Sequence, residues 1–146
     1  MSNSYIFMNN NYKKVFEYYC KIDEGADPVY DINEIQYGDM IFEDNNEWTR
    51  IESLCDDEFC EEVLLELSHN DKLVYIFIDE DNLNCQLVVI NNNVIIRKFY
   101  NYKDTPDLNE NIGKLNMEDE VPITCWQDMD YILNVLKENP NKLFDI

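Results

Sequence analysis

Three apolar runs in the middle of the chain decide the fold: Lys72–Asp79 (KLVYIFID), Cys85–Ile90 (CQLVVI) and Val94–Tyr100 (VIIRKFY). They are rich in β-branched and aromatic residues, which favour strands. The breaks between them are short and polar, and the second is the triplet Asn91-Asn92-Asn93. Strand-like runs joined by such breaks predict an antiparallel meander.

A further hairpin is predicted upstream of this meander. Asp39–Glu43 (DMIFE) and Glu47–Ile51 (EWTRI) are strand-like, and they flank Asp44-Asn45-Asn46. Asp and Asn favour turns because they tolerate left-handed backbone conformations. We therefore expect these two runs to pair as antiparallel strands.

Two other segments fit both the helical and the strand period. In residues 56–68 (DDEFCEEVLLELS), Phe59, Val63 and Leu67 recur at helical spacing, but apolar residues of the same stretch also alternate as in a strand. For this segment we favour a short helical turn that leads into a strand. Residues 12–22 (YKKVFEYYCKI) remain open between helix and strand.

The C-terminal region predicts a helix. Thr124-x-x-Gln127 has the form of a capping box, and Asn139-Pro140 marks the end. Between these limits an apolar stripe recurs at helical spacing: Trp126, Met129, Ile132, Leu133 and Leu136. Residues 101–123 are predicted to form a polar connection between the strands and this helix. The fold class is therefore predicted to be α+β, an antiparallel sheet of about five or six strands with this helix packed on it.

Length and composition predict one globular domain, residues 1–146. A chain of 146 residues can bury roughly two-thirds of its unfolded surface. Hydrophobic residues make up 45% of the chain and aromatic residues 13%, which is enough for a core. A disordered acidic tail has few aromatic residues, so this class is excluded.

The charge is unusual. The chain holds 31 Asp and Glu against 11 Lys and Arg, a net charge of −20. Self-repulsion on this scale destabilises a compact state. One interpretation is solubility alone, and the other is steering towards a positively charged partner. Nucleic acid and anionic membranes would repel this surface, so we expect neither as a direct partner.

The sequence favours a cytoplasmic location. Residues 1–10 (MSNSYIFMNN) lack the basic start and apolar run of a signal peptide. No window approaches the roughly 20 apolar residues of a membrane span. The cysteine count is odd and without a CxxC pair, which is typical of reduced thiols in the cytosol: Cys20, Cys55, Cys60, Cys85 and Cys125.

No catalytic constellation is visible, and we predict that the protein is not an enzyme. His69 is the only histidine and lies in a predicted turn, where a surface role is the simpler interpretation. Cys55 and Cys60 lack the further ligands of a zinc site. The three glycines lie too far apart for a phosphate-binding loop. We therefore expect no catalytic, cofactor-binding or metal-binding residues, and no cofactor.

Clustered acidic residues are the remaining candidates for a site. Any single cluster can be an ordinary solvated face. Several clusters with few intervening cations favour a partner-binding surface. The predicted partner-binding residues are Asp56, Asp57, Glu58, Glu61 and Glu62 in a first cluster, and Glu118, Asp119 and Glu120 in a second.

Short motifs in the last third of the chain carry a resemblance: Arg97–Tyr102 (RKFYNY), Asp104-Thr105-Pro106, Asn109, Gly113-Lys114-Leu115, Pro122-Ile123 and Trp126-x-Asp128. In these motifs the chain resembles small bacterial immunity proteins, the antitoxin partners of contact-dependent growth inhibition and other polymorphic toxin systems. The resemblance implies a cytosolic protein that binds one cognate toxin domain and blocks it. It implies no catalytic residues.

The charge agrees with this implication. A toxin that cleaves nucleic acid must carry a basic surface to hold phosphates, and carboxylates can occupy that surface. The expected partner is thus a basic protein toxin of the nuclease type. Two alternatives stay open at this point. One is a DNA mimic that inhibits a restriction or RNA-guided nuclease, and the other is a small acidic enzyme or ligand-binding module with a deep pocket.

Overall fold

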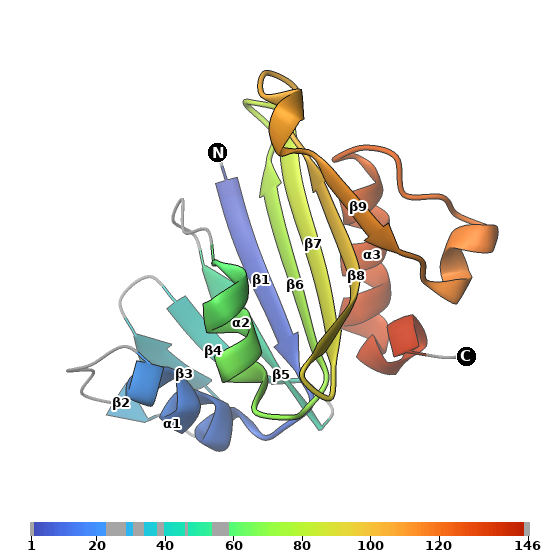
Figure 1. Cartoon of the computed structure of the whole chain (residues 1–146). Coiled ribbons are helices and arrows are strands. Elements are labelled where there is room, and N and C mark those ends of the chain that lie inside the picture. The colour runs from blue at the N-terminus through green and yellow to red at the C-terminus, as the bar shows by residue number, and fades with distance from the viewer. Residues whose placement is uncertain are drawn as a thin grey trace.

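The computed structural model describes residues 2–22, 29–30, 34–37, 40–45, 47–53 and 59–144. In these residues nine strands form one sheet in the order β2-β3-β4-β5-β1-β6-β7-β8-β9 (Figure 1). The strands are β1 Ser2–Met8, β2 Val29–Tyr30, β3 Glu34–Tyr37, β4 Met40–Asn45, β5 Trp48–Ser53, β6 Leu73–Asp79, β7 Asn84–Asn91, β8 Val94–Asn101 and β9 Glu110–Gly113. The α-helices are α1 Tyr12–Ile22, α2 Glu61–Ser68 and α3 Asp128–Glu138.

The first strand of the chain lies in the middle of the sheet. β1 pairs antiparallel with β5 on one side and with β6 on the other, so that Tyr5 lies opposite both Glu52 and Ile76. It joins two antiparallel meanders, β2–β5 and β6–β9. The sheet is therefore not one continuous meander, and it has more strands than the five or six predicted.

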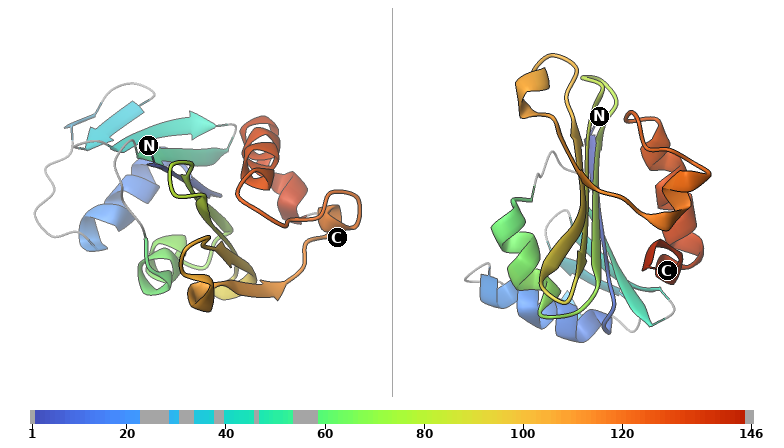
Figure 2. Two further views of the ribbon diagram at one scale, coloured as in Figure 1. Left: turned by 90° about the horizontal axis from the view of Figure 1, so that it is seen from above. Right: turned by 45° about the vertical axis from the view of Figure 1, so that its right-hand side comes forward.

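Helices cover both faces of the sheet. Figure 2 (right) shows α1 and α2 on one side and α3 on the other. Val74 and Ile76 of β6 belong to the core beneath α3, whereas Leu73 and Tyr75 belong to the core beneath α1 and α2. This two-sided burial explains why the run LVYIFI is apolar at every position, because a strand covered on both faces has no solvent side.

The α+β class, the central meander and the β4–β5 hairpin are confirmed. Residues 12–22 are helical as α1, whose Phe16 is buried and packs edge-on against Phe42 with ring centroids 5.1 Å apart. The predicted strand after a short helical turn in residues 56–68 is wrong. The helix α2 continues to Ser68, where buried Leu64 and Leu67 share one face, and the next strand begins only at Leu73.

The start of α3 also differs from the prediction. The helix begins at Asp128, and Gln127 makes no side-chain cap. Instead, the Asp128 carboxylate accepts hydrogen bonds from Thr124 N at 2.7 Å, Thr124 Oγ1 at 3.0 Å and Cys125 N at 3.1 Å. The buried stripe of α3 is otherwise as predicted, with Met129, Ile132, Leu133 and Leu136 in the core, and Trp126 packs partly buried against it.

The predicted polar connection contains a strand. β9 pairs with β8, and the chain then turns away at Gly113, which adopts a φ of +77°. A Cβ at this position would lie 2.1 Å from the carbonyl oxygen of Ile96, so only glycine fits. Two 3₁₀ turns, Pro106–Leu108 and Asn116–Asp119, flank the strand.

Candidate partner-binding site

The described part of the first acidic cluster borders an open groove beside the N-terminal end of α2. Glu61 and Glu62 occupy the first turn of this helix. The groove has a volume of about 580 Å³, and we call it the α2 groove. It is lined by Phe59, Cys60, Glu61, Glu62, Gln86, Lys98 and Tyr100. Asp56, Asp57 and Glu58 lie outside the described residues.

The strand register places three of the lining residues, Gln86, Lys98 and Tyr100, next to one another. Gln86 of β7 pairs with Tyr100 of β8, and Val88 pairs with Lys98. Because side chains alternate along a strand, Lys98 and Tyr100 share one face. Tyr100 packs against the core beneath α1 and α2, so this face is the one that α2 partly covers.

A chain of hydrogen bonds holds two of the lining residues, Phe59 and Gln86, in place. The Phe59 amide donates to the Tyr75 hydroxyl at 3.2 Å, and that hydroxyl donates to Gln86 Oε1 at 3.1 Å. Gln86 Nε2 in turn donates to the Tyr102 hydroxyl. Tyr75 is 0% exposed and Gln86 5% exposed, so these partners satisfy polar groups that water does not reach.

One ammonium group is held between carboxylates of two elements. Lys98 Nζ forms ion pairs with Glu61 of α2 and with Glu110 of β9. It also lies over the ring of Tyr100, 4.8 Å from the centroid. Burial alone would lower the pKa of Lys98, but hydrogen bonds to Glu110 and Glu61 outweigh it and raise that pKa. Two carboxylates, Glu61 and Glu62, therefore line the groove, and Glu110 reaches Lys98 from β9 beside it.

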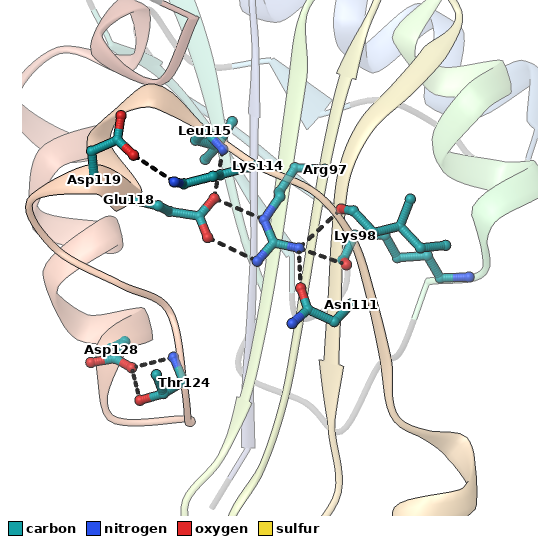
Figure 3. A network of polar contacts seen from close by, with 10 residues as sticks. Arg97, Lys98, Asn111, Lys114, Leu115, Glu118, Asp119, Thr124 and Asp128 are labelled. Carbon is teal, nitrogen blue, oxygen red and sulfur yellow. Dashed lines mark hydrogen bonds and ion pairs between the residues drawn. The ribbon is translucent and has the colours of Figure 1, made fainter.

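The second acidic cluster does not form a continuous surface. Glu118 is 8% exposed, and its carboxylate receives Arg97 Nε at 2.8 Å, Arg97 Nη2 at 2.9 Å and Leu115 N at 2.6 Å (Figure 3). Its charge is neutralised inside the protein and cannot meet a partner. Asp119 is exposed and pairs with Lys114, while Glu120 is exposed.

His69 has a structural position. It follows the last turn of α2 with a φ of +48°, and its exposed ring stacks on Tyr18 with centroids 4.1 Å apart. In the described part of the chain, no group of three or more His, Cys, Asp or Glu residues is placed to hold a metal ion. Cys60, Cys85 and Cys125 are free thiols, and burial raises the pKa of Cys85 to about 12.

The groove residues other than Glu61 and Glu62 were not predicted. A signal was present in the strand pattern: Gln86 interrupts the apolar run CQLVVI, and Lys98 and Tyr100 alternate with Arg97 and Phe99. A polar side chain within a strand that is buried on both faces needs partners, and here these partners build the groove.

No family model, curated protein or solved structure matches this chain. Within the described residues, each helix is too short or too polar to cross a membrane.

Proposed function

We propose that this protein is an immunity protein that binds and neutralises a basic toxin domain in the cytosol. The observation that carries the proposal is a net charge of −20 combined with the placement of the acids. Of the acidic side chains that the structure describes, Glu118 is the buried one, and the others are half-buried or exposed. The charge is thus directed outwards, where it acts on a partner.

Electrostatics gives such a surface a kinetic role. Complementary potentials raise association rates by roughly 10- to 1,000-fold over those of neutral surfaces. An antitoxin must capture its toxin before damage accumulates, so fast association is an advantage that solubility alone would not require. The same surface repels nucleic acid and anionic membranes, which leaves a basic protein as the partner that fits best.

A nuclease domain is the toxin class with the matching surface. To hold a phosphate backbone it must present Lys and Arg around its active site. An acidic protein that covers those residues excludes the substrate without any chemistry of its own. The motifs in residues 97–128 that resemble immunity proteins point in the same direction. The proposed role includes no catalytic residue and no cofactor.

The test uses the polypeptide encoded by the neighbouring reading frame. That polypeptide is expressed alone and together with this chain, and growth and the integrity of cellular RNA and DNA are followed. We expect toxicity alone, protection on co-expression, and a tight one-to-one complex by titration calorimetry. Failure to protect or to form the complex would contradict the proposal. Equally tight binding to an unrelated basic DNA-binding protein would favour a DNA mimic.

A further inference from the structure

We propose that the α2 groove receives an arginine or lysine side chain of the partner, and that Lys98 occupies its place in the free protein. This inference rests on the proposed function, because it names the contact through which a basic partner would be held. It assigns two roles. Glu61, which lines the groove, and Glu110, which reaches Lys98 from β9 beside it, are the anionic receptor, and Lys98 is an internal competitor for it.

The arrangement around Lys98 is that of a bound cation. Carboxylates from two elements far apart in sequence, α2 and β9, converge on one ammonium group, with an aromatic ring beneath it. The side chain of Lys98 is 12% exposed, so its stem is packed while its charged end reaches the groove. Opposite charges at close range together with a ring face are what proteins use to hold ammonium and guanidinium ligands.

The remaining space favours a cation over other ligands. The groove has about 580 Å³, within the range of roughly 300–1,000 Å³ that ligand sites occupy. Glu62 is exposed at its rim and forms no ion pair in the described part of the chain. An anion in the groove would meet the carboxylates of Glu61 and Glu62 against the one ammonium of Lys98. The side-chain amide of Gln86, which also lines the groove, already donates to Tyr102.

Arginine fits this site better than lysine. Its planar guanidinium can donate to two carboxylates at once and can stack on aromatic rings such as those of Phe59 and Tyr100, which line the groove. Glu61 and Glu62 stand in the first turn of α2, at the positive end of the helix dipole.

The test measures a small cationic probe on the whole protein. The probe is the acetylated and amidated peptide Gly-Arg-Gly, and its control is the same peptide with citrulline, which has nearly the same shape but no charge. Binding is followed at low salt by amide chemical shifts of the groove residues. We expect the arginine peptide to shift them saturably and the citrulline peptide to leave them unchanged.

Lys98→Met provides the decisive comparison. Removing the competitor frees two carboxylates, so we expect it to tighten probe binding about three- to fivefold, the size of an exposed ion pair. The matched control is Lys142→Met, which removes the same charge from a pair with Glu138 outside the groove. Lys98→Gln serves as a second variant, and the amide spectrum of each variant checks that the fold is intact. Equal effects of the Lys98 and Lys142 variants would overturn the proposal.

The receptor carboxylates are tested in the same way. Glu61→Gln with Glu110→Gln should abolish saturable binding of the probe, whereas Glu66→Gln, on the same helix but outside the groove, should not. Repeating these variants with the toxin domain separates the two proposals. If that domain binds normally to the Glu61/Glu110 variant, the groove inference is wrong and the proposed function is retained. If the peptide binds the protein but the toxin domain does not, the proposed function is wrong.

Discussion

Arg97 is the residue on which the C-terminal third of the fold depends. It is 2% exposed, and besides its paired bonds to Glu118 its Nη1 donates to the carbonyls of Lys98 and Ile112 and to Asn111 Oδ1. A guanidinium has five N–H donors in a fixed plane, so one side chain can join β8, β9 and the connection to α3. A shorter or more flexible cationic side chain could not join these three parts of the chain.

The first prediction concerns this buried pair. Arg97→Met leaves the Glu118 carboxylate buried without a cation, and we expect it to lower the free energy of unfolding by about 3–5 kcal/mol. The double variant Arg97→Met with Glu118→Leu should recover a large part of that loss, because no charge remains buried. Urea denaturation of the two single variants and the double variant measures the coupling. Strictly additive losses would contradict the ion-pair account.

At the scale of elements, the start of α3 is set by a side chain that reaches backwards. The Asp128 carboxylate accepts bonds from Thr124 and Cys125, four and three residues before it. Burial alone would raise the pKa of Asp128, but the hydrogen bonds from the Thr124 and Cys125 amides outweigh it and lower that pKa. The folded state thus favours the ionised form.

The second prediction follows from the sign of this shift. Because the pKa of Asp128 is lower in the folded state, its ionisation stabilises the fold above the unfolded value of 3.8, and this contribution is lost as pH falls through the folded pKa. Asp128→Ala should cost about 1 kcal/mol at neutral pH, as the loss of a helix cap does. The difference from wild type should shrink below pH 3.8. Asp130→Ala, exposed in the same turn, is the control and should show a smaller loss.

How far the sequence predicts these elements depends on how local their signal is. β6, β7 and β8 were predicted because each is a nearly continuous apolar run bounded by turn residues. The central strand β1 was not, because its apolar part is short and its pairing with β5 and β6 joins segments about 45 to 75 residues apart. The buried stripe of α3 was predicted, whereas its start depends on one carboxylate that the capping-box pattern did not identify.

The candidate site was also predicted only in part, because some of its contacts join segments far apart in the sequence. Glu61 and Glu62 were predicted from local charge density alone. Lys98 and Glu110 were not, because their ion pairs join β8 to α2 and β9, and a sequence pattern carries no signal for such pairs. Glu118 was grouped with exposed acids because it lies in a run of three, although its partner Arg97 is 21 residues away.

At the scale of the whole molecule, charge is the property that links fold to function. The sheet and its helices bury the apolar side chains on two faces, and this leaves the acids outside to generate a strong negative field. That field, more than any single contact, is what we propose steers the partner. Its range falls with salt, since the screening length is about 30 Å at roughly 0.01 M and about 8 Å at roughly 0.15 M.

The most direct test of this account is the association rate constant with the toxin domain, measured by stopped flow between about 0.01 M and about 0.15 M salt. We predict a fall of roughly tenfold or more. Neutralising Asp56, Asp57, Glu58, Glu61 and Glu62 together should lower the rate and flatten its salt dependence, with the thermal midpoint unchanged or raised by relief of self-repulsion. The comparison is the double variant Asp119→Asn with Glu120→Gln, which leaves the buried Glu118 unchanged. A rate that is indifferent to salt and to both sets of substitutions would contradict the account and leave solubility as the role of the charge.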